Sequence, residues 1–228
     1  MMGLVPFILV VLLLLIFIKT TFVLLSLLLC AVVLFFILRK FSKFTSKVDT
    51  FDNDQFLESI KKKDIILCGN SPKFPEAFSK VTITPNTFII RFNTILDHID
   101  PDSKTDVLFV SKELLEKYSI DEFTTWKNKC QQCKIYYIDS LLKNNKVLDE
   151  INKVQKLNFT SGFICLSYLC SADVNSITLV GFDLPDDYKT PVNWFRKNVM
   201  YTGHDIKSEK EILSELIKKY KINKISVN

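Results

Sequence analysis

Two residues near the end of the chain have the types and spacing of a proton-transfer site. His204 is one of only two histidines among the 228 residues, and it precedes a helix-like stretch that starts at Glu209. Histidine is the side chain whose unperturbed pKa lies near neutrality, so His204 could accept a proton from a hydroxyl at physiological pH. The same segment is also an ordinary helix start, because Ser208 and Glu211 satisfy a capping box.

Polar turns follow two apolar runs further up the chain. Residues 69–71 read Gly-Asn-Ser directly after the first run. Gly69 would let a backbone approach a nucleotide closely, and Asn70 can donate and accept hydrogen bonds to phosphate or ribose. Arg91 and Asn93 lie at the end of the next run. They could contact a ligand, or Arg91 could be a surface cation and Asn93 a turn former. Each turn alone is also compatible with an ordinary loop.

A third polar turn, Thr160-Ser161-Gly162, lies immediately before an apolar helix-like stretch. Hydroxyls at such a position normally cap the helix. The exposed amides and the positive end of the helix dipole also bind phosphate. This turn therefore predicts either a helix cap or part of an anion site.

Short, largely apolar runs predict the strands that must position these turns. Such runs suit strands buried on both faces, as in parallel sheets, and helix-like stretches alternate with them. We therefore predict a single-domain α/β fold, Rossmann-like, with a mostly parallel sheet and helices on both faces. The strand candidates are residues 65–68, 88–90, 107–110, 135–138, 177–180 and 222–227, and the main helix candidates are residues 141–157, 162–171 and 209–220.

Residues 1–40 are predicted to form a transmembrane anchor. Lys19 is the one charged side chain before Arg39, and apolar runs at 2–18 and 22–38 flank it. A spanning helix needs about 20 apolar residues, so the sequence permits one long span or a tight hairpin of two. We expect residues 41–62 to be a polar stem and residues 63–228 to be the catalytic domain.

The composition argues against nucleic-acid and metal sites. The net charge is only +5, and the lysine run at 61–63 has no aromatic interleaving and no nucleic-acid motif around it. Of the six cysteines, Cys30 lies in the anchor, and the odd number left over argues against a fully paired framework. Cys130 and Cys133 lack the second pair or nearby histidine that a tetrahedral metal site needs.

In their order along residues 64–228, the motifs resemble the eukaryotic-type sialyltransferases, glycosyltransferase family 29. The family's large motif has a Gly-Asn-Ser turn and then a strand ending Arg-x-Asn, as at residues 69–71 and 91–93. Its small motif has a Ser-Thr-Gly turn, an apolar helix and a strand ending Gly-Phe. Residues 160–162 match that turn with Ser and Thr exchanged, and residues 181–182 match the Gly-Phe. The last family motif, His and then Glu five positions later, fits His204 and Glu209.

The resemblance implies an inverting transfer of sialic acid from CMP-sialic acid to a sugar hydroxyl, on a variant GT-A fold and without a metal. It makes His204 the general base and places Glu209 beside it in the catalytic motif. It implies no cofactor besides the donor substrate, and its partners are that donor, a glycan acceptor and the membrane. The substrate-binding positions that it implies are Asn70, Ser71, Arg91, Asn93, Thr160, Ser161, Gly162, Gly181 and Asn193.

The chain departs from the family in two respects. Asn193-Trp194 stands where the family has a His-Tyr pair at the donor phosphate, and Arg196 is a nearby candidate to neutralise that phosphate instead. The resemblance implies a Golgi-type luminal domain, whereas the basic residues after the anchor indicate a cytosolic one. Two alternatives therefore stay open: a transferase for another nucleotide-sugar, and a catalytically silent membrane-anchored nucleotide-binding protein.

Overall fold

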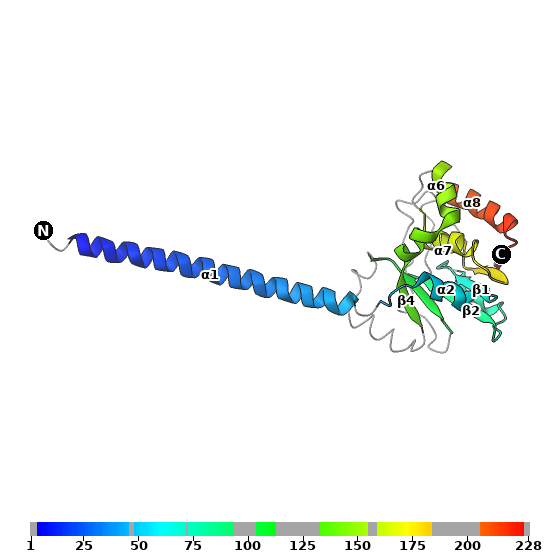
Figure 1. Cartoon of the computed structure of the whole chain (residues 1–228), viewed down its shortest axis with the longest axis horizontal. Coiled ribbons are helices and arrows are strands. Elements are labelled where there is room, and N and C mark those ends of the chain that lie inside the picture. The colour runs from blue at the N-terminus through cyan, green and yellow to red at the C-terminus, as the bar shows by residue number, and fades with distance from the viewer. Residues whose placement is uncertain are drawn as a thin grey trace. The chain divides into compact units, whose positions relative to one another are not determined.

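The chain divides into two compact units, Met1–Lys47 and Val48–Asn228. A computed structural model describes residues 4–45, 48–71, 73–93, 104–112, 133–154, 159–183 and 206–225 (Figure 1). The first unit contains α1 (Leu4–Thr45), an uninterrupted helix of 42 residues. The structure thus forms one helix where the sequence also permitted a hairpin.

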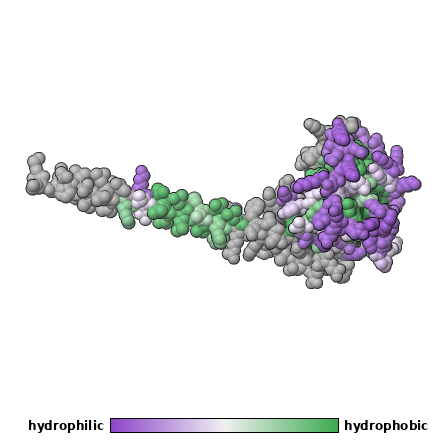
Figure 2. Space-filling view, viewed as in Figure 1, coloured by the Kyte–Doolittle hydropathy of each residue, from purple (hydrophilic) through white to green (hydrophobic). Residues whose placement is uncertain are grey.

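α1 contains a window that is long and apolar enough to cross a membrane. The window is Phe17–Phe36, with 20 residues, a mean hydropathy of 2.4 and no buried residue. Figure 2 shows this part of α1 as mostly hydrophobic. A helix of that length extends about 30 Å, the thickness of a bilayer's hydrocarbon core. In the part of the chain that the structure describes, α1 is the one helix that meets these criteria.

The second unit is built on a six-stranded sheet in which every neighbouring pair is parallel. The strand order is β4-β3-β2-β1-β5-β6, so the direction of winding reverses between β1 and β5. The prediction of a Rossmann-like parallel sheet is confirmed. The strands are β1 (Asp64–Cys68), β2 (Thr87–Phe92), β3 (Val107–Val110), β4 (Lys134–Tyr137), β5 (Ser176–Val180) and β6 (Asn223–Ile225).

Helices cover both faces of this sheet, and strand alternation divides its side chains between two cores. On β1, Ile65 and Leu67 enter the larger core, whereas Ile66 and Cys68 enter the smaller one. α3 (Phe74–Ser79) packs on the smaller core. The larger core is covered by α2 (Asn53–Ile60), α6 (Lys146–Val154), α7 (Ser161–Leu169) and α8 (Ile206–Lys219).

The predicted helix over residues 141–157 differs from the structure, which has a 3₁₀ segment, η1 (Ile138–Asn144), followed by α6. The interruption lies at Asn145, which is fully buried. Its side-chain oxygen accepts from the Leu148 N–H at 3.1 Å, and its amide donates to the Ser167 hydroxyl at 2.9 Å. Asn145 thus caps α6 and ties it to α7, and this capping ends the preceding segment.

The predicted polar stem over residues 41–62 also differs from the structure. Phe56 and Ile60, one turn apart on α2, are 2% and 0% exposed in the larger core. Upstream of them, Asp49 makes two hydrogen bonds to Ile135 of β4. Its N–H donates to the Ile135 carbonyl at 2.7 Å, and its carboxylate accepts from the Ile135 N–H at 2.8 Å. The chain from Val48 onward is therefore domain, because the polar residues are the outer face of an amphipathic helix.

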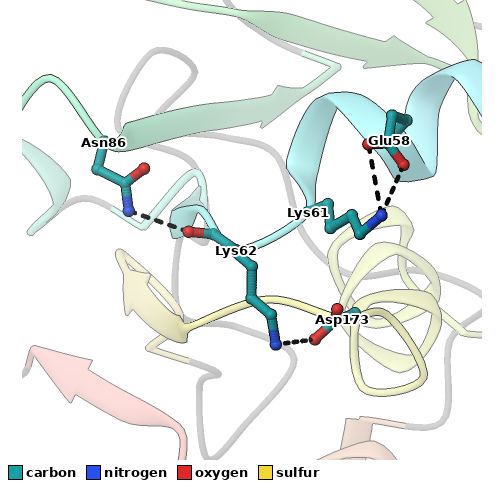
Figure 3. Close-up of polar contacts among 5 residues, drawn as sticks. All are labelled: Glu58, Lys61, Lys62, Asn86 and Asp173. Atoms are coloured by element: carbon teal, nitrogen blue, oxygen red, sulfur yellow. Dashed lines mark hydrogen bonds and ion pairs between the residues drawn. The ribbon is translucent and has the colours of Figure 1, made fainter.

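The lysine run at 61–63 forms the tight turn between α2 and β1 (Figure 3). Lys62 has a positive φ of 56°, its carbonyl accepts from Asn86 Nδ2 at 3.0 Å, and its ammonium pairs with Asp173 at 2.7 Å. Lys61 pairs with Glu58 at 3.1 Å. The run thus fixes the amino end of β1 to its neighbours, at the end of the sheet opposite to the predicted site.

Candidate functional site

Asn93 is the central residue of the predicted site. It follows β2 directly and has a left-handed backbone with φ of 61°, which turns its side chain away from the strand direction. Its amide nitrogen donates to the Ser161 hydroxyl at 2.8 Å, and its amide oxygen accepts from the Ser111 N–H at 2.9 Å. These two bonds join the ends of β2 and β3 to the start of α7.

Asn70 extends this cluster to the end of β1. Its side-chain amide donates to the Phe92 carbonyl at 3.3 Å, so the turn after β1 is bonded to the end of β2. Asn70, Asn93 and Ser161 are all partly exposed. Three predicted donor-site residues, from segments far apart in the sequence, therefore lie together at the carboxyl edge of the sheet, where open α/β sheets bind ligands.

The α7 helix starts at this edge, and Thr160 is its N-cap. The Thr160 hydroxyl accepts from the Phe163 N–H at 3.4 Å, which is a long hydrogen bond. Ser161 occupies the first helical position, where backbone N–H groups point outward and the helix dipole is positive. The predicted cap is thus present, and the same terminus has the chemistry of an anion site.

Glu209 in the first turn of α8 is buried against this cap, at 2% exposure. Its carboxylate accepts from the Thr160 N–H at 2.8 Å and from the Thr160 hydroxyl at 2.5 Å. The sequence placed Glu209 in the catalytic motif. These contacts hold the start of α8 against the start of α7, and the catalytic role of Glu209 stays a prediction.

Gly69 and Gly181 have a structural explanation that the sequence did not reveal. A Cβ on Gly69 would meet the Gly181 carbonyl oxygen at 2.1 Å, and Gly181 itself has a positive φ of 71°. The turns after β1 and β5 are thus in backbone contact, which the Ser71 N–H reinforces by donating to the Gly181 carbonyl at 3.2 Å. The close approach that Gly69 permits is to this neighbouring turn, where the sequence suggested a nucleotide.

Ser71 and Asp183 fasten the same two turns through their side chains. The Ser71 hydroxyl donates to the Asp183 carboxylate at 3.1 Å, and Lys224 of β6 lies 3.8 Å from the other carboxylate oxygen. Ser71 is only 4% exposed. The turns after β1 and β5 are therefore bonded to each other, and the partly exposed Asn70, Asn93 and Ser161 follow β1, follow β2 and begin α7.

Gly162 serves close packing. A Cβ there would meet the Phe92 ring at 2.9 Å and the Phe182 ring at 3.1 Å. Those two rings pack edge to face, with their centroids 5.8 Å apart. Glycine at this position thus lets the first turn of α7 sit directly on the aromatic ends of β2 and β5.

Arg91 lies on the α3 side of the sheet, apart from the Asn93 cluster. Arg91 is 5% exposed. Its guanidinium carbon lies 5.3 Å from the Phe74 ring centroid and 5.2 Å from the Phe78 ring centroid. Cys68 is also here. Burial raises the pKa of its thiol to about 11, and the Arg91 charge opposes that rise. The Arg91 guanidinium thus makes cation–π contacts with these two rings, and its substrate contact stays a prediction.

Two predicted site residues, His204 and Asn193, lie outside the described residues. Two residues that sequence reasoning missed, Ser111 and Asp183, take part in the site's framework. Both follow the carboxyl end of an apolar strand, and this position in the sequence could have identified them.

A cavity of about 240 Å³ lies at the amino end of the strands, lined in part by Asp64, Thr84, Thr87 and Ser176. The Asp64 carboxylate there already accepts from Asn86 at 3.0 Å and from Ser176 at 2.8 Å. The cavity thus has satisfied polar groups and lies away from the Asn93 cluster. Within the described residues, no group of three or more His, Cys, Asp or Glu side chains gathers.

The chain matches no protein-family model and no curated protein, but its fold resembles those of solved sialyltransferases. A mammalian sialyltransferase in complex with Gal-beta-1-3GalNAc-ortho-nitrophenol aligns with 83% of this chain and 79% of its own, at 16% identity and a TM-score of 0.51. The sialyltransferase CstII from Campylobacter jejuni, in complex with cytidine-5'-monophosphate, aligns with 72% of this chain and 79% of its own, at 17% identity and a TM-score of 0.45. The resemblance predicted from the motifs is thus confirmed at the level of the fold, by the mammalian enzyme.

Proposed function

We propose that this chain is a membrane-anchored glycosyltransferase that transfers sialic acid from CMP-sialic acid to a sugar hydroxyl. The observation that carries the proposal is the meeting of Asn70, Asn93 and Ser161 at the carboxyl edge of the sheet. The sequence motifs predicted these residues as donor contacts, and the fold shared with a mammalian sialyltransferase supports that reading.

In the proposed donor site, the start of α7 faces the phosphate of CMP. Its N–H groups and positive dipole end favour an anion there. Asn93 is held by two hydrogen bonds, so its side chain is pre-oriented before the donor arrives. Ser161 is hydrogen-bonded to the Asn93 side chain, and Asn70 is hydrogen-bonded to the carbonyl of Phe92, the residue before Asn93. We infer that these three residues contact the cytidine monophosphate part of the donor.

The proposed reaction is a single displacement with inversion. The acceptor hydroxyl oxygen bonds to the anomeric carbon of sialic acid while the bond from that carbon to the phosphate oxygen breaks, and its electron pair leaves with CMP. His204 takes the hydroxyl proton as general base, a role worth about 10²- to 10⁴-fold in rate. The proposal includes no metal, and full activity in EDTA is its expected result.

Glu209 gives the His204 spacing a physical explanation. His204 precedes α8 by two positions, and Glu209 in the first turn of α8 is bonded to the N-cap of α7. The start of α8, the helix that follows the proposed base in the sequence, is therefore fastened to the helix that faces the donor phosphate in this proposal.

The test measures CMP release from CMP-sialic acid by the purified full-length chain in detergent, with a galactose-terminated acceptor. His204→Ala should lower kcat by about 10²-fold or more while CMP affinity stays within about twofold. His98→Ala, the change at the only other histidine, is the matched control and should keep wild-type turnover.

Three outcomes would contradict the proposal. Turnover that persists in His204→Ala removes the assigned base. CMP binding without turnover in the wild type favours a silent nucleotide-binding protein, and turnover of UDP- or GDP-sugars in preference to CMP-sialic acid assigns another donor.

A further inference from the structure

We propose that the domain from Val48 onward is held on the cytosolic face of the membrane, in a reducing compartment. The proposal rests on the membrane-anchoring part of the proposed function and is independent of the sialyl-transfer part. Three observations support it: the charges that flank α1, the short connection to the domain, and the state of the cysteines.

The charges around the apolar window of α1 are strongly asymmetric. Residues 1–16 carry no Lys or Arg, and Lys19 lies at the upstream end of the window Phe17–Phe36. Basic side chains then follow within about 11 residues of the window's end, and no acidic residue intervenes before Asp49; the basic residues are Arg39, Lys40, Lys43 and Lys47. Positive residues this close to a span keep that side cytosolic.

The connection to the domain is too short to change sides. α1 continues to Thr45, and the second compact unit begins at Val48. Asp49 is already hydrogen-bonded to Ile135 of β4. The basic flank and the domain therefore lie on the same side of the membrane, so the orientation of the flank fixes the orientation of the domain.

Three described cysteines of the domain, Cys68, Cys165 and Cys170, form no disulfide. Cys68 and Cys165 are buried, at 2% and 1% exposure. Cys68 lies in the core under α3, whereas Cys165 lies in the core on the opposite face, so the sheet separates them. Domains in secreted and luminal proteins form and keep disulfides, whereas domains in reducing compartments keep their cysteines as thiols. Unpaired, buried thiols thus fit the cytosolic side.

The chain contains its own reporter of topology. Residues 158–160 read Asn-Phe-Thr, an N-glycosylation acceptor sequence that only a luminal chain can use. In the folded domain, Phe159 stacks on Phe163 with a centroid distance of 4.6 Å, and the Thr160 hydroxyl is bonded to Glu209. Asn158 directly precedes Phe159 and Thr160 in the sequence. A cytosolic domain never encounters the glycosylating enzyme.

The experiment translates the full chain in the presence of microsomes. The wild type should resist alkaline carbonate extraction, stay unglycosylated, and lose its domain to protease added outside without detergent. Its six thiols should all react with maleimide after denaturation without reductant. Protection of the domain from protease, a glycan at Asn158, or release by carbonate would each overturn the proposal.

A charge-exchanged variant supplies the positive control. Gly3→Lys and Leu4→Lys together with Arg39→Glu, Lys40→Glu, Lys43→Glu and Lys47→Glu should invert the chain, so that the domain becomes protected and glycosylated. Adding Asn158→Gln to this variant should abolish the glycan and keep the protection. No step measures activity, so a failure here leaves sialyl transfer untouched, and a failure of the His204→Ala test leaves topology untouched.

Discussion

The Glu209 carboxylate accepts hydrogen bonds from both the N–H and the hydroxyl of Thr160, at 2.8 and 2.5 Å. Thr160 is the N-cap of α7, and Glu209 lies in the first turn of α8. A buried carboxylate with two such bonds fixes the relative position of the two helix starts. The candidate site lies beside one of them, so its geometry depends on this pair.

Glu209→Gln should therefore destabilise the domain. The Gln side chain keeps one acceptor oxygen, but its NH₂ group then faces either the N–H or the hydroxyl of Thr160, both of which donate to Glu209. The expected loss in the free energy of unfolding is about 1–3 kcal/mol. Thermal unfolding of the chain in detergent, followed by tryptophan fluorescence, measures the change. Glu211→Gln on the exposed side of α8 is the control and should stay within about 0.5 kcal/mol of wild type. Equal stability of the two variants would contradict the positioning role.

Gly69→Ala should damage the fold more than Gly162→Ala. The added methyl of Gly69→Ala meets a backbone carbonyl oxygen at 2.1 Å, whereas that of Gly162→Ala meets ring atoms at 2.9 Å and beyond. The aromatic rings near Gly162 can shift by tenths of an ångström. The backbone of the turn at Gly181 cannot move away from Gly69 without breaking the contact between the two turns. We expect a loss of about 3 kcal/mol or more for Gly69→Ala and about 1–2 kcal/mol for Gly162→Ala. Urea unfolding of the two variants decides the order, and the reverse order would refute it.

Asn93→Gly should weaken CMP binding by about tenfold, because it removes two side-chain hydrogen bonds and retains a residue that tolerates φ of 61°. Calorimetric titration with CMP gives the affinity. Lys221→Gly is the matched control, since Lys221 also has a positive φ, of 52°, in the turn before β6. Unchanged CMP affinity in Asn93→Gly would remove Asn93 from the donor site.

Stability should fall as pH rises from about 9 to about 11. Burial raises the pKa of the Cys68 thiol from 9.0 to about 11, so the folded state keeps a proton that the unfolded state releases. The stabilisation is complete below pH 9 and is lost through the folded pKa, with a slope of up to about 1.4 kcal/mol per pH unit for one group.

Urea unfolding at pH 8, 9 and 10 tests this dependence. Cys68→Ala should show a smaller decline than wild type, while Cys30→Ala, a change on the exposed surface of α1, should decline as wild type does. An identical decline in Cys68→Ala would assign the effect to other groups. Cys165, Cys170 and Tyr168 account for the rest of the decline. Burial raises the pKa of the Cys165 thiol, and it raises those of Cys170 and Tyr168 to about 12.

The sequence predicted the sheet well because its strands are buried on both faces, which leaves unbroken apolar runs such as that of β1. It placed α2 in a polar stem outside the domain, since only Phe56 and Ile60 mark the buried face of an otherwise polar helix. The polar turns were located correctly, as Asn93 and Ser161 show. Their individual roles depend on contacts between distant segments: Gly69 against Gly181 is such a contact, and no spacing in the sequence reveals it.

The two residues between α1 and Val48 also limit how far the domain can reach. From Phe36 to Thr45 the helix advances about 14 Å, and the chain from there to Asp49 adds at most about 14 Å. In a membrane-anchored chain, the domain would therefore begin within about 28 Å of chain from the end of the apolar window. If the chain is the proposed transferase, an acceptor confined to the same membrane would meet it at a higher effective concentration than an acceptor free in solution.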